Sequence, residues 1–187
     1  MSLYFGSPAG SPYGYCWLRL KYRIKERGKR MNTARLVKEK LLAANWTITF
    51  MESCTSGLLA SLLTDNEGAS AVFRGSIVTY SNEAKEAAGV SPFVIEEYGV
   101  YSPECAREMA AAAQEAYCAE VAVAITGTTG NVDPNNGDSV EGEACYCIII
   151  GGDIYDYRIK ADVRGMTRRE IKEYYAKEVY EKLAELL

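Results

Sequence analysis

Residues 46–64, with the sequence WTITFMESCTSGLLASLLT, contain the strand, turn and helix that decide the fold of this chain. Trp46 to Met51 is short and mostly apolar, which is typical of a strand inside a sheet. Ser53 to Gly57 is rich in small polar residues and ends in glycine, as turns often do. Leu58 to Thr64 then has the apolar composition of a helix that packs on the sheet. A strand that passes through a turn into a helix is a typical unit of α/β proteins.

The same alternation of strands and helices continues on both sides of this unit. Before it we expect a helix over residues 34–44, capped by Asn32 or Thr33 and ended by Asn45. After it we expect, in order, a strand at Ser76–Tyr80, a helix at Asn82–Ala88, helices that begin after Ser91-Pro92 and Ser102-Pro103, a strand at Val121–Thr126, a hairpin of Glu143–Ile150 and Tyr155–Lys160 around Gly151-Gly152, and a last helix after the capping box Thr167–Glu170. The pattern predicts an α/β fold in which helices cover both faces of a sheet.

The composition limits the chemistry that this chain can perform. The 187 residues fit one domain with a sizeable core, and they include no histidine. Ser-His-Asp and Cys-His hydrolases are therefore excluded, and so is any metal site with a histidine ligand. If the chain activates a nucleophile, lysine is the best remaining candidate for the base.

The cysteines and the hydropathy indicate a cytoplasmic protein. None of the six cysteines forms a CxxC pair, and no apolar signal-peptide segment precedes them, so we interpret them as reduced thiols. No apolar run reaches the roughly 18 residues that a membrane span needs. We therefore expect no membrane partner.

The first 30 residues differ in charge from the rest of the chain. They hold seven Lys/Arg and one acidic residue, which gives them a net charge of +6. Because the whole chain has a net charge of −4, residues 31–187 have a net charge of −10. Apolar and basic residues alternate over residues 18–25, which predicts either an added edge strand or a disordered basic leader before a main domain at 31–187. The acidic main domain does not favour nucleic acid, but it permits a small anionic ligand.

Two polar side chains that follow predicted strands are candidates for a catalytic pair. Ser53 lies where a strand ends and a helix begins, where free N–H groups can stabilise an oxyanion or hold a phosphate; alternatively, Ser53 or Thr55 simply caps the helix. Lys85 can deprotonate a serine only if burial or a nearby positive charge such as Arg164 lowers its pKa. Tyr80, five residues before Lys85, is a candidate to relay the proton or to orient the lysine. The alternative for Lys85 is a solvated lysine on a helix face that pairs with Glu86 or Glu83.

The strand at 121–126 leads into a further candidate segment. Thr126 and Gly127 end it, and a glycine there lets the backbone approach a ligand closely. The loop that follows, to about Gly142, is long, and such loops are often functional or mobile. Its acidic residues match no metal-ligand spacing. Arg164, ahead of the last helix, either clamps a phosphate or carboxylate or is a surface arginine.

Four segments together resemble the CinA C-terminal domain family. They are ESCTSG at 52–57, GASAVFRG at 68–75, VTYSNEAK at 78–85 and Gly89-Val90. The resemblance covers roughly residues 33–187. It implies a three-layer α/β/α sandwich with a mixed, mainly parallel sheet, and a homodimer.

The resemblance also implies an activity, because the family includes nicotinamide mononucleotide amidases. These enzymes hydrolyse the carboxamide of nicotinamide mononucleotide to nicotinic acid mononucleotide and ammonia, with a serine–lysine pair and without a metal or other cofactor. Carried over to this chain, Ser53 would be the nucleophile, Lys85 the general base and Tyr80 an orienting residue. The substrate would be bound by Cys54, Thr55, Ser56, Gly57, Thr126 and Gly127, and its phosphate by Arg164.

The chain departs from the family pattern at three places. Ser56 replaces the first of two glycines, and Met51 replaces an alanine. The larger departure is at residues 128–144, where a different sequence replaces the family's usual glycine-rich loop. Two alternatives to the mononucleotide amidase therefore stay open: the same chemistry on another small amide, or a non-catalytic module that binds a nucleotide or regulates.

Overall fold

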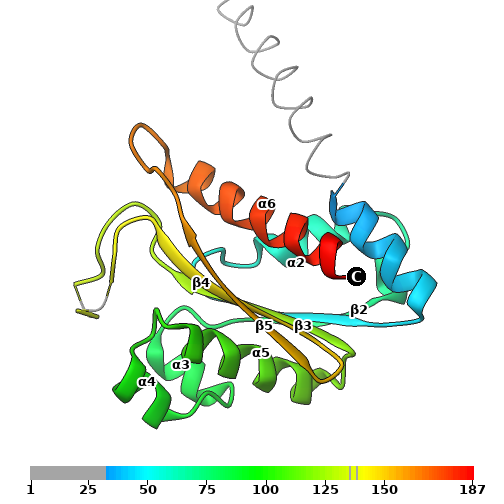
Figure 1. The fold of residues 1–187 in the computed structure, drawn as a ribbon, viewed down its shortest axis with the longest axis horizontal. Coiled ribbons are helices and arrows are strands. Elements are labelled where there is room, and N and C mark those ends of the chain that lie inside the picture. The colour runs from blue at the N-terminus through cyan, green and yellow to red at the C-terminus, as the bar shows by residue number, and fades with distance from the viewer. Residues whose placement is uncertain (1–32, 135, 138) are drawn as a thin grey trace, which may run out of the picture.

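The computed structural model describes residues 33–187 except 135 and 138, and it contains one five-stranded sheet with helices on both faces (Figure 1). The strand order is β2-β1-β3-β4-β5. The strands are β1 (Ile48–Glu52), β2 (Phe73–Val78), β3 (Val121–Gly127), β4 (Glu143–Ile150) and β5 (Asp153–Lys160). The leader or edge strand predicted within residues 1–30 lies outside the described residues.

The sheet is mixed, as the sequence predicts. β1 pairs in parallel with β2 and β3, whereas β4 pairs antiparallel with β3 and β5. Four strands therefore run in one direction and β4 opposes them, although the strand pairs divide evenly into two parallel and two antiparallel. The antiparallel half follows from the predicted hairpin, because a two-residue turn at Gly151-Gly152 can join only antiparallel strands.

The helices form two layers, so the predicted α/β/α sandwich is confirmed (Figure 1). One layer holds the helix over residues 33–44, α2 (Leu58–Thr64) and α6 (Arg168–Leu186); the other holds α3 (Asn82–Ala87), α4 (Pro92–Tyr98) and α5 (Pro103–Tyr117). A short 3-10 helix at Ala69–Ala71 precedes β2.

Alternation along β1 divides the core between the two layers. Phe50 belongs to the cluster under α2 and α6, whereas the next residue, Met51, belongs to the cluster under α5. Successive side chains of a strand point to opposite faces, so one fully buried strand supplies both cores. Cys145 and Cys147 share one face and are free thiols, as their spacing of two predicts.

Most predicted elements lie within two residues of their observed bounds, but β2 does not. We expect it at Ser76–Tyr80, and it spans Phe73–Val78. β2 is an edge strand that pairs with β1, and the register ends where Val78 meets Glu52, the last residue of β1. Thr79 and Tyr80 thus leave the sheet toward the site described below. Of the helices in the described part of the chain, none has the length and apolar character to cross a membrane.

Candidate functional site

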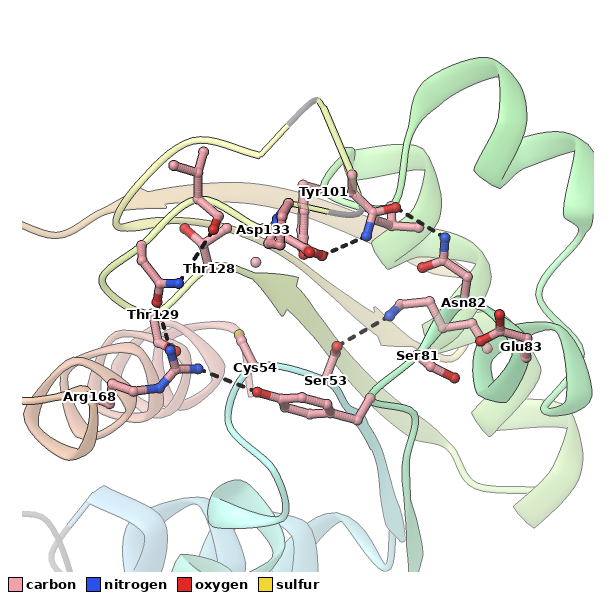
Figure 2. A pocket seen from close by; sticks show the side chains of 18 residues that line it. Ser53, Cys54, Ser81, Asn82, Glu83, Tyr101, Thr128, Thr129, Asp133 and Arg168 are labelled. Atoms are coloured by element: carbon pink, nitrogen blue, oxygen red, sulfur yellow. Dashed lines mark hydrogen bonds between the residues drawn. The ribbon is translucent and has the colours of Figure 1, made fainter.

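Ser53 and Lys85 meet at the carboxyl end of the parallel strands. Ser53 directly follows β1, and Lys85 lies in α3, which β2 reaches through residues 79–81. The Nζ of Lys85 donates a hydrogen bond of 3.2 Å to the Oγ of Ser53 (Figure 2). It donates another of 3.3 Å to the carbonyl oxygen of Thr79. Lys85 is only 2% exposed. The alternative that Lys85 is a solvated helix-face lysine is therefore wrong.

Burial lowers the pKa of Lys85. The loss of solvent around the ammonium group is the main cause, and the nearby Cys105, Cys54 and Asp133 act in the opposite direction. Arg164, which we considered as another cause of a lowered pKa, is not among the groups that shift the pKa of Lys85. A buried lysine of lowered pKa beside a serine hydroxyl is the arrangement that a serine–lysine pair requires.

Glu52 holds the turn that carries Ser53. It is completely buried, and its carboxylate accepts hydrogen bonds from the Thr55 hydroxyl at 2.7 Å and from the backbone N–H groups of Leu59 and Ala60 at 3.0 Å each. The N-cap residue Gly57 makes no side-chain cap for α2, so the carboxylate of Glu52 takes that role from five residues away. This replaces the expectation that Ser53 or Thr55 caps the helix, and it leaves the Ser53 hydroxyl to Lys85.

The pocket around this pair, the Ser53 pocket, has a volume of about 460 Å³. Five of the predicted site residues line it: Ser53, Lys85, Tyr80, Cys54 and Gly127. The side chains in Figure 2 converge on it from the turn after β1, α3, the loop at 128–142 and α6. Residues that the sequence reasoning did not assign also line it, among them Asn82, Tyr101, Thr128, Asp133 and Arg168.

Cys54, next to Ser53, is not a competing nucleophile. Burial raises the pKa of its thiol to about 12, and the carboxylate of Glu52 adds to the effect. The reactive form of a cysteine is the thiolate. At neutral pH the thiol therefore stays protonated, which leaves the Ser53 hydroxyl as the candidate nucleophile in this turn.

Four of the other predicted binding residues lie outside the Ser53 pocket. The hydroxyl of Thr126 is buried and donates a 2.7 Å hydrogen bond to the carbonyl oxygen of Val100. Thr55, Ser56 and Gly57 instead line a neighbouring hollow. Ser56 and Gly57 both have left-handed backbone, with φ of 54° and 87°. Glycine adopts that conformation freely and serine does not. The serine at position 56, where the family usually has glycine, therefore makes the backbone of this turn less favourable.

The predicted phosphate ligand Arg164 does not reach the pocket. Its side chain is 88% exposed and forms an ion pair of 2.7 Å with Asp162, because the turn before α6 folds it back onto the residue two positions earlier. Arg168, the first residue of α6, lines the pocket instead. Its guanidinium donates to the Oδ1 of Asn131 at 2.7 Å and to the hydroxyl of Tyr80 at 3.4 Å (Figure 2).

Tyr80 lies at the mouth of the pocket rather than against the lysine. Its side chain is 62% exposed. Its described hydrogen-bond partner is Arg168. No hydrogen bond of Tyr80 to Ser53 or Lys85 is present among the described residues, so the predicted orienting role has no direct contact behind it.

The rebuilt loop at 128–142 is tied to the helix that carries Lys85. The Oδ2 of Asp133 accepts hydrogen bonds of 2.6 Å from both the Tyr101 hydroxyl and the Nδ2 of Asn136. Asn82, the first residue of α3, donates to the Oδ1 of Asn136 at 3.0 Å. These contacts fold the loop over the pocket as its wall. In the sequence, the length of this loop and the glycine at the end of the preceding strand indicated a functional segment. The spacing of its residues did not predict which side chains they contact.

Comparison with known proteins gives the family. The sequence profile of the CinA C-terminal domain matches residues 30–187. A CinA-like protein from Fervidobacterium nodosum is 40% identical over 139 residues, which cover 72% of this chain and 33% of that protein. A protein from Mycoplasma pneumoniae, named Protein MG115 homolog, is 35% identical over 159 residues, 82% of this chain and 96% of that protein. The chain thus spans a third or less of the CinA-like proteins that it matches in F. nodosum and Mycobacterium marinum.

Solved structures agree with this. A competence-damaged protein (CinA) superfamily protein from Escherichia coli superposes with a TM-score of 0.77 at 28% identity, over 84% of this chain and 90% of that one. The competence/damage inducible protein CihA from Agrobacterium tumefaciens gives a TM-score of 0.75 at 28% identity, over 84% and 94%. The chain therefore belongs to the CinA C-terminal domain family.

Proposed function

We propose that this protein is a metal-independent amidase that hydrolyses the carboxamide of nicotinamide mononucleotide through Ser53 and Lys85. The observation that carries the proposal is the 3.2 Å contact between the buried Nζ of Lys85 and the Oγ of Ser53. This contact lies in a cavity of about 460 Å³, which suits a small ligand. The products would be nicotinic acid mononucleotide and ammonia.

The two side chains suffice for a complete cycle of acyl transfer. Neutral Lys85 takes the proton of Ser53 as the serine oxygen attacks the carboxamide carbon. The resulting ammonium of Lys85 protonates the amide nitrogen, the C–N bond breaks and ammonia leaves. A water molecule, deprotonated by Lys85, then attacks the ester of Ser53, and the proton returns to the serine oxygen as the acid departs.

The turn after Ser53 supplies donors for the negative charge of the tetrahedral intermediate. Within the described residues, the backbone N–H groups of Cys54 and Thr55 donate to no backbone carbonyl. N–H groups fixed in a buried turn stabilise an oxyanion because they need not reorient during the reaction. Glu52 keeps this turn rigid.

The walls of the pocket suit a pyridine mononucleotide. Arg168 offers a guanidinium with a neutral asparagine and a neutral tyrosine as partners, and it can bind a phosphate with two N–H groups. The exposed ring of Tyr80 and the carboxylate of Asp133 favour a cationic aromatic ring such as pyridinium. We therefore assign the phosphate to Arg168 and the pyridinium to the side of Tyr80 and Asp133.

A second candidate is the same reaction on another small amide. The loop at 128–142 favours it, because this segment departs from the usual family sequence and places Asp133 and Asn136 in the wall of the pocket. The serine–lysine chemistry is the same for both candidates, and only the identity of the amide differs.

The test is ammonia release from nicotinamide mononucleotide by wild type, Ser53→Ala and Lys85→Met. Lys177→Met is the matched control, since Lys177 lies on the solvent side of α6 and pairs with Glu181. We expect wild type and Lys177→Met to release ammonia, and each site variant to lose on the order of 10³-fold or more in kcat.

Three other results would count against the proposal in different ways. Full activity in Ser53→Ala would overturn the nucleophile. Binding of the mononucleotide without release by wild type would identify a binding module. Neither binding nor release would direct a screen of other small amides toward the second candidate.

A further inference from the structure

A second hollow of about 360 Å³ lies beside the Ser53 pocket, and we call it the basic hollow. Its walls are the turn after β1, the start of α2 and the first turns of α6. Ser56 and Ser61 line it on one side, and Arg168, Arg169 and Lys172 line it on the other. Arg168 lines both cavities, so the two adjoin at this residue.

The basic hollow carries positive charge that the described residues do not neutralise. None of the described residues that line it is acidic. Arg169 forms an ion pair with Glu173. In the described part of the chain, however, Arg168 and Lys172 have only uncharged hydrogen-bond partners, and for Lys172 this is the Oγ of Ser56 at 3.0 Å. Although the domain has a net charge of −10, these two cations lie one helical turn apart and make this hollow locally positive. Such a local charge favours the binding of an anion.

The basic hollow is also connected to the catalytic turn. The hydroxyl of Ser56, which Lys172 contacts, donates a 3.3 Å hydrogen bond to the carbonyl oxygen of Ser53. The positive charge of Lys172 acts on the thiol of Cys54 as well. An anion in the basic hollow would therefore lie next to the residues that hold the nucleophile.

We propose that the basic hollow is a second phosphate subsite, so that the substrate class extends from the pyridine mononucleotide to pyridine dinucleotides. The inference rests on the proposed function, because it takes the amide to lie at Ser53 and the first phosphate at Arg168. The two phosphates of a dinucleotide share a bridging oxygen, so the second must lie directly beside the first. A guanidinium has five N–H donors in a plane, so Arg168 can contact two neighbouring phosphates, one on each side of its side chain. Lys172 then also binds the second phosphate.

The experiment measures binding by calorimetry on the Ser53→Ala protein, which keeps the ligand intact. The ligands are nicotinamide mononucleotide, nicotinamide adenine dinucleotide, inorganic phosphate and inorganic pyrophosphate. Each is titrated into Ser53→Ala alone and into Ser53→Ala combined with Lys172→Met, Lys172→Gln or Lys177→Met. Lys172→Gln keeps a donor for Ser56 and removes the charge, and Lys177→Met is the matched control.

We expect both Lys172 variants to weaken the dinucleotide and pyrophosphate about tenfold or more, while the affinity for the mononucleotide changes less than about twofold. Lys177→Met should change none of them. A similar loss for the mononucleotide would place its single phosphate in the basic hollow and overturn the second subsite. A loss confined to inorganic phosphate and pyrophosphate would show a site for free ions and overturn the substrate assignment. No loss in either Lys172 variant would overturn the proposal.

Ammonia release separates this proposal from the proposed function. If wild type releases no ammonia from either nucleotide but binds the dinucleotide through Lys172, the amidase is wrong and the phosphate subsite stands. If wild type hydrolyses the mononucleotide and Lys172→Met leaves dinucleotide binding unchanged, the amidase stands and the subsite is wrong.

Discussion

Lys85 is charged or neutral according to its surroundings, and its role depends on which form is present. As an ammonium it donates to Ser53 and Thr79, and as an amine it can accept the serine proton. Burial lowers its pKa from the ordinary 10.5, so the neutral form is reached at a lower pH than for a solvated lysine. The same burial opposes folding while Lys85 is charged, by about 1.4 kcal/mol for each tenfold loss of proton affinity.

The titration of Lys85 therefore predicts two linked pH dependences. We expect kcat/KM to rise with pH to a plateau, with a midpoint below 10.5, because only neutral Lys85 is a base. The unfolded chain binds this proton more tightly than the folded one, so the contribution of Lys85 to stability is full above 10.5 and is lost as pH falls through the folded pKa. The melting temperature of Lys85→Met, relative to wild type, should then decrease as pH rises. A rate that is flat over the whole range would contradict this.

At the scale of the element, the turn between β1 and α2 is kept in place by one buried carboxylate. Glu52 accepts three hydrogen bonds, one from a hydroxyl and two from backbone N–H groups of α2. α2 is seven residues long and has no side-chain cap at Gly57. A helix this short is not stable by itself, so its position and that of Ser53 depend on contacts such as these.

Replacing this carboxylate should loosen the turn. We expect Glu52→Gln to lower the free energy of unfolding by about 2–4 kcal/mol, because its amide NH₂ group faces donors and leaves some of them unsatisfied. We also expect a lower kcat, since Ser53 loses its fixed position. Urea unfolding and ammonia release measure the two effects. Glu67→Gln, at an exposed position before β2, is the matched control. Equal stability of the two variants would show that Glu52 does not hold the turn.

At the scale of the whole molecule, the site is assembled from segments far apart in the sequence. The turn after β1 supplies Ser53, α3 supplies Lys85, the loop at 128–142 supplies Asp133 and α6 supplies Arg168. These segments meet because the parallel strands end at one edge of the sheet and α6 begins above it (Figure 1). The residues that line the Ser53 pocket thus come from both helical layers.

Chelation of metal ions should leave this chemistry unchanged. The chain has no histidine, and in its described part no three of His, Cys, Asp and Glu come together as metal ligands would. We expect EDTA to alter neither ammonia release nor the melting temperature. Loss of activity with EDTA that returns on adding a divalent ion would overturn the metal-independent mechanism.

The sequence by itself determined the features that depend on residues close together in the chain. The capping box at Thr167 and Glu170 starts α6 as predicted, and Asn45, with a φ of 54°, ends the helix at 33–44. The hairpin at Gly151-Gly152 and the turn that presents Ser53 were predicted for the same reason. Such signals are readable because they act over a few residues, where the backbone fixes which groups can meet.

Only the tertiary structure decided which side chains meet across elements. Lys85 lies 32 residues from Ser53 in the sequence, and only its burial in the fold distinguishes a candidate base from a solvated lysine. Arg164 and Arg168 differ by four positions, yet one turns back to Asp162 while the other lines the pocket. The reason is physical: burial, pKa and the partners of a long charged side chain depend on the packing of neighbouring elements, and no local pattern encodes that packing.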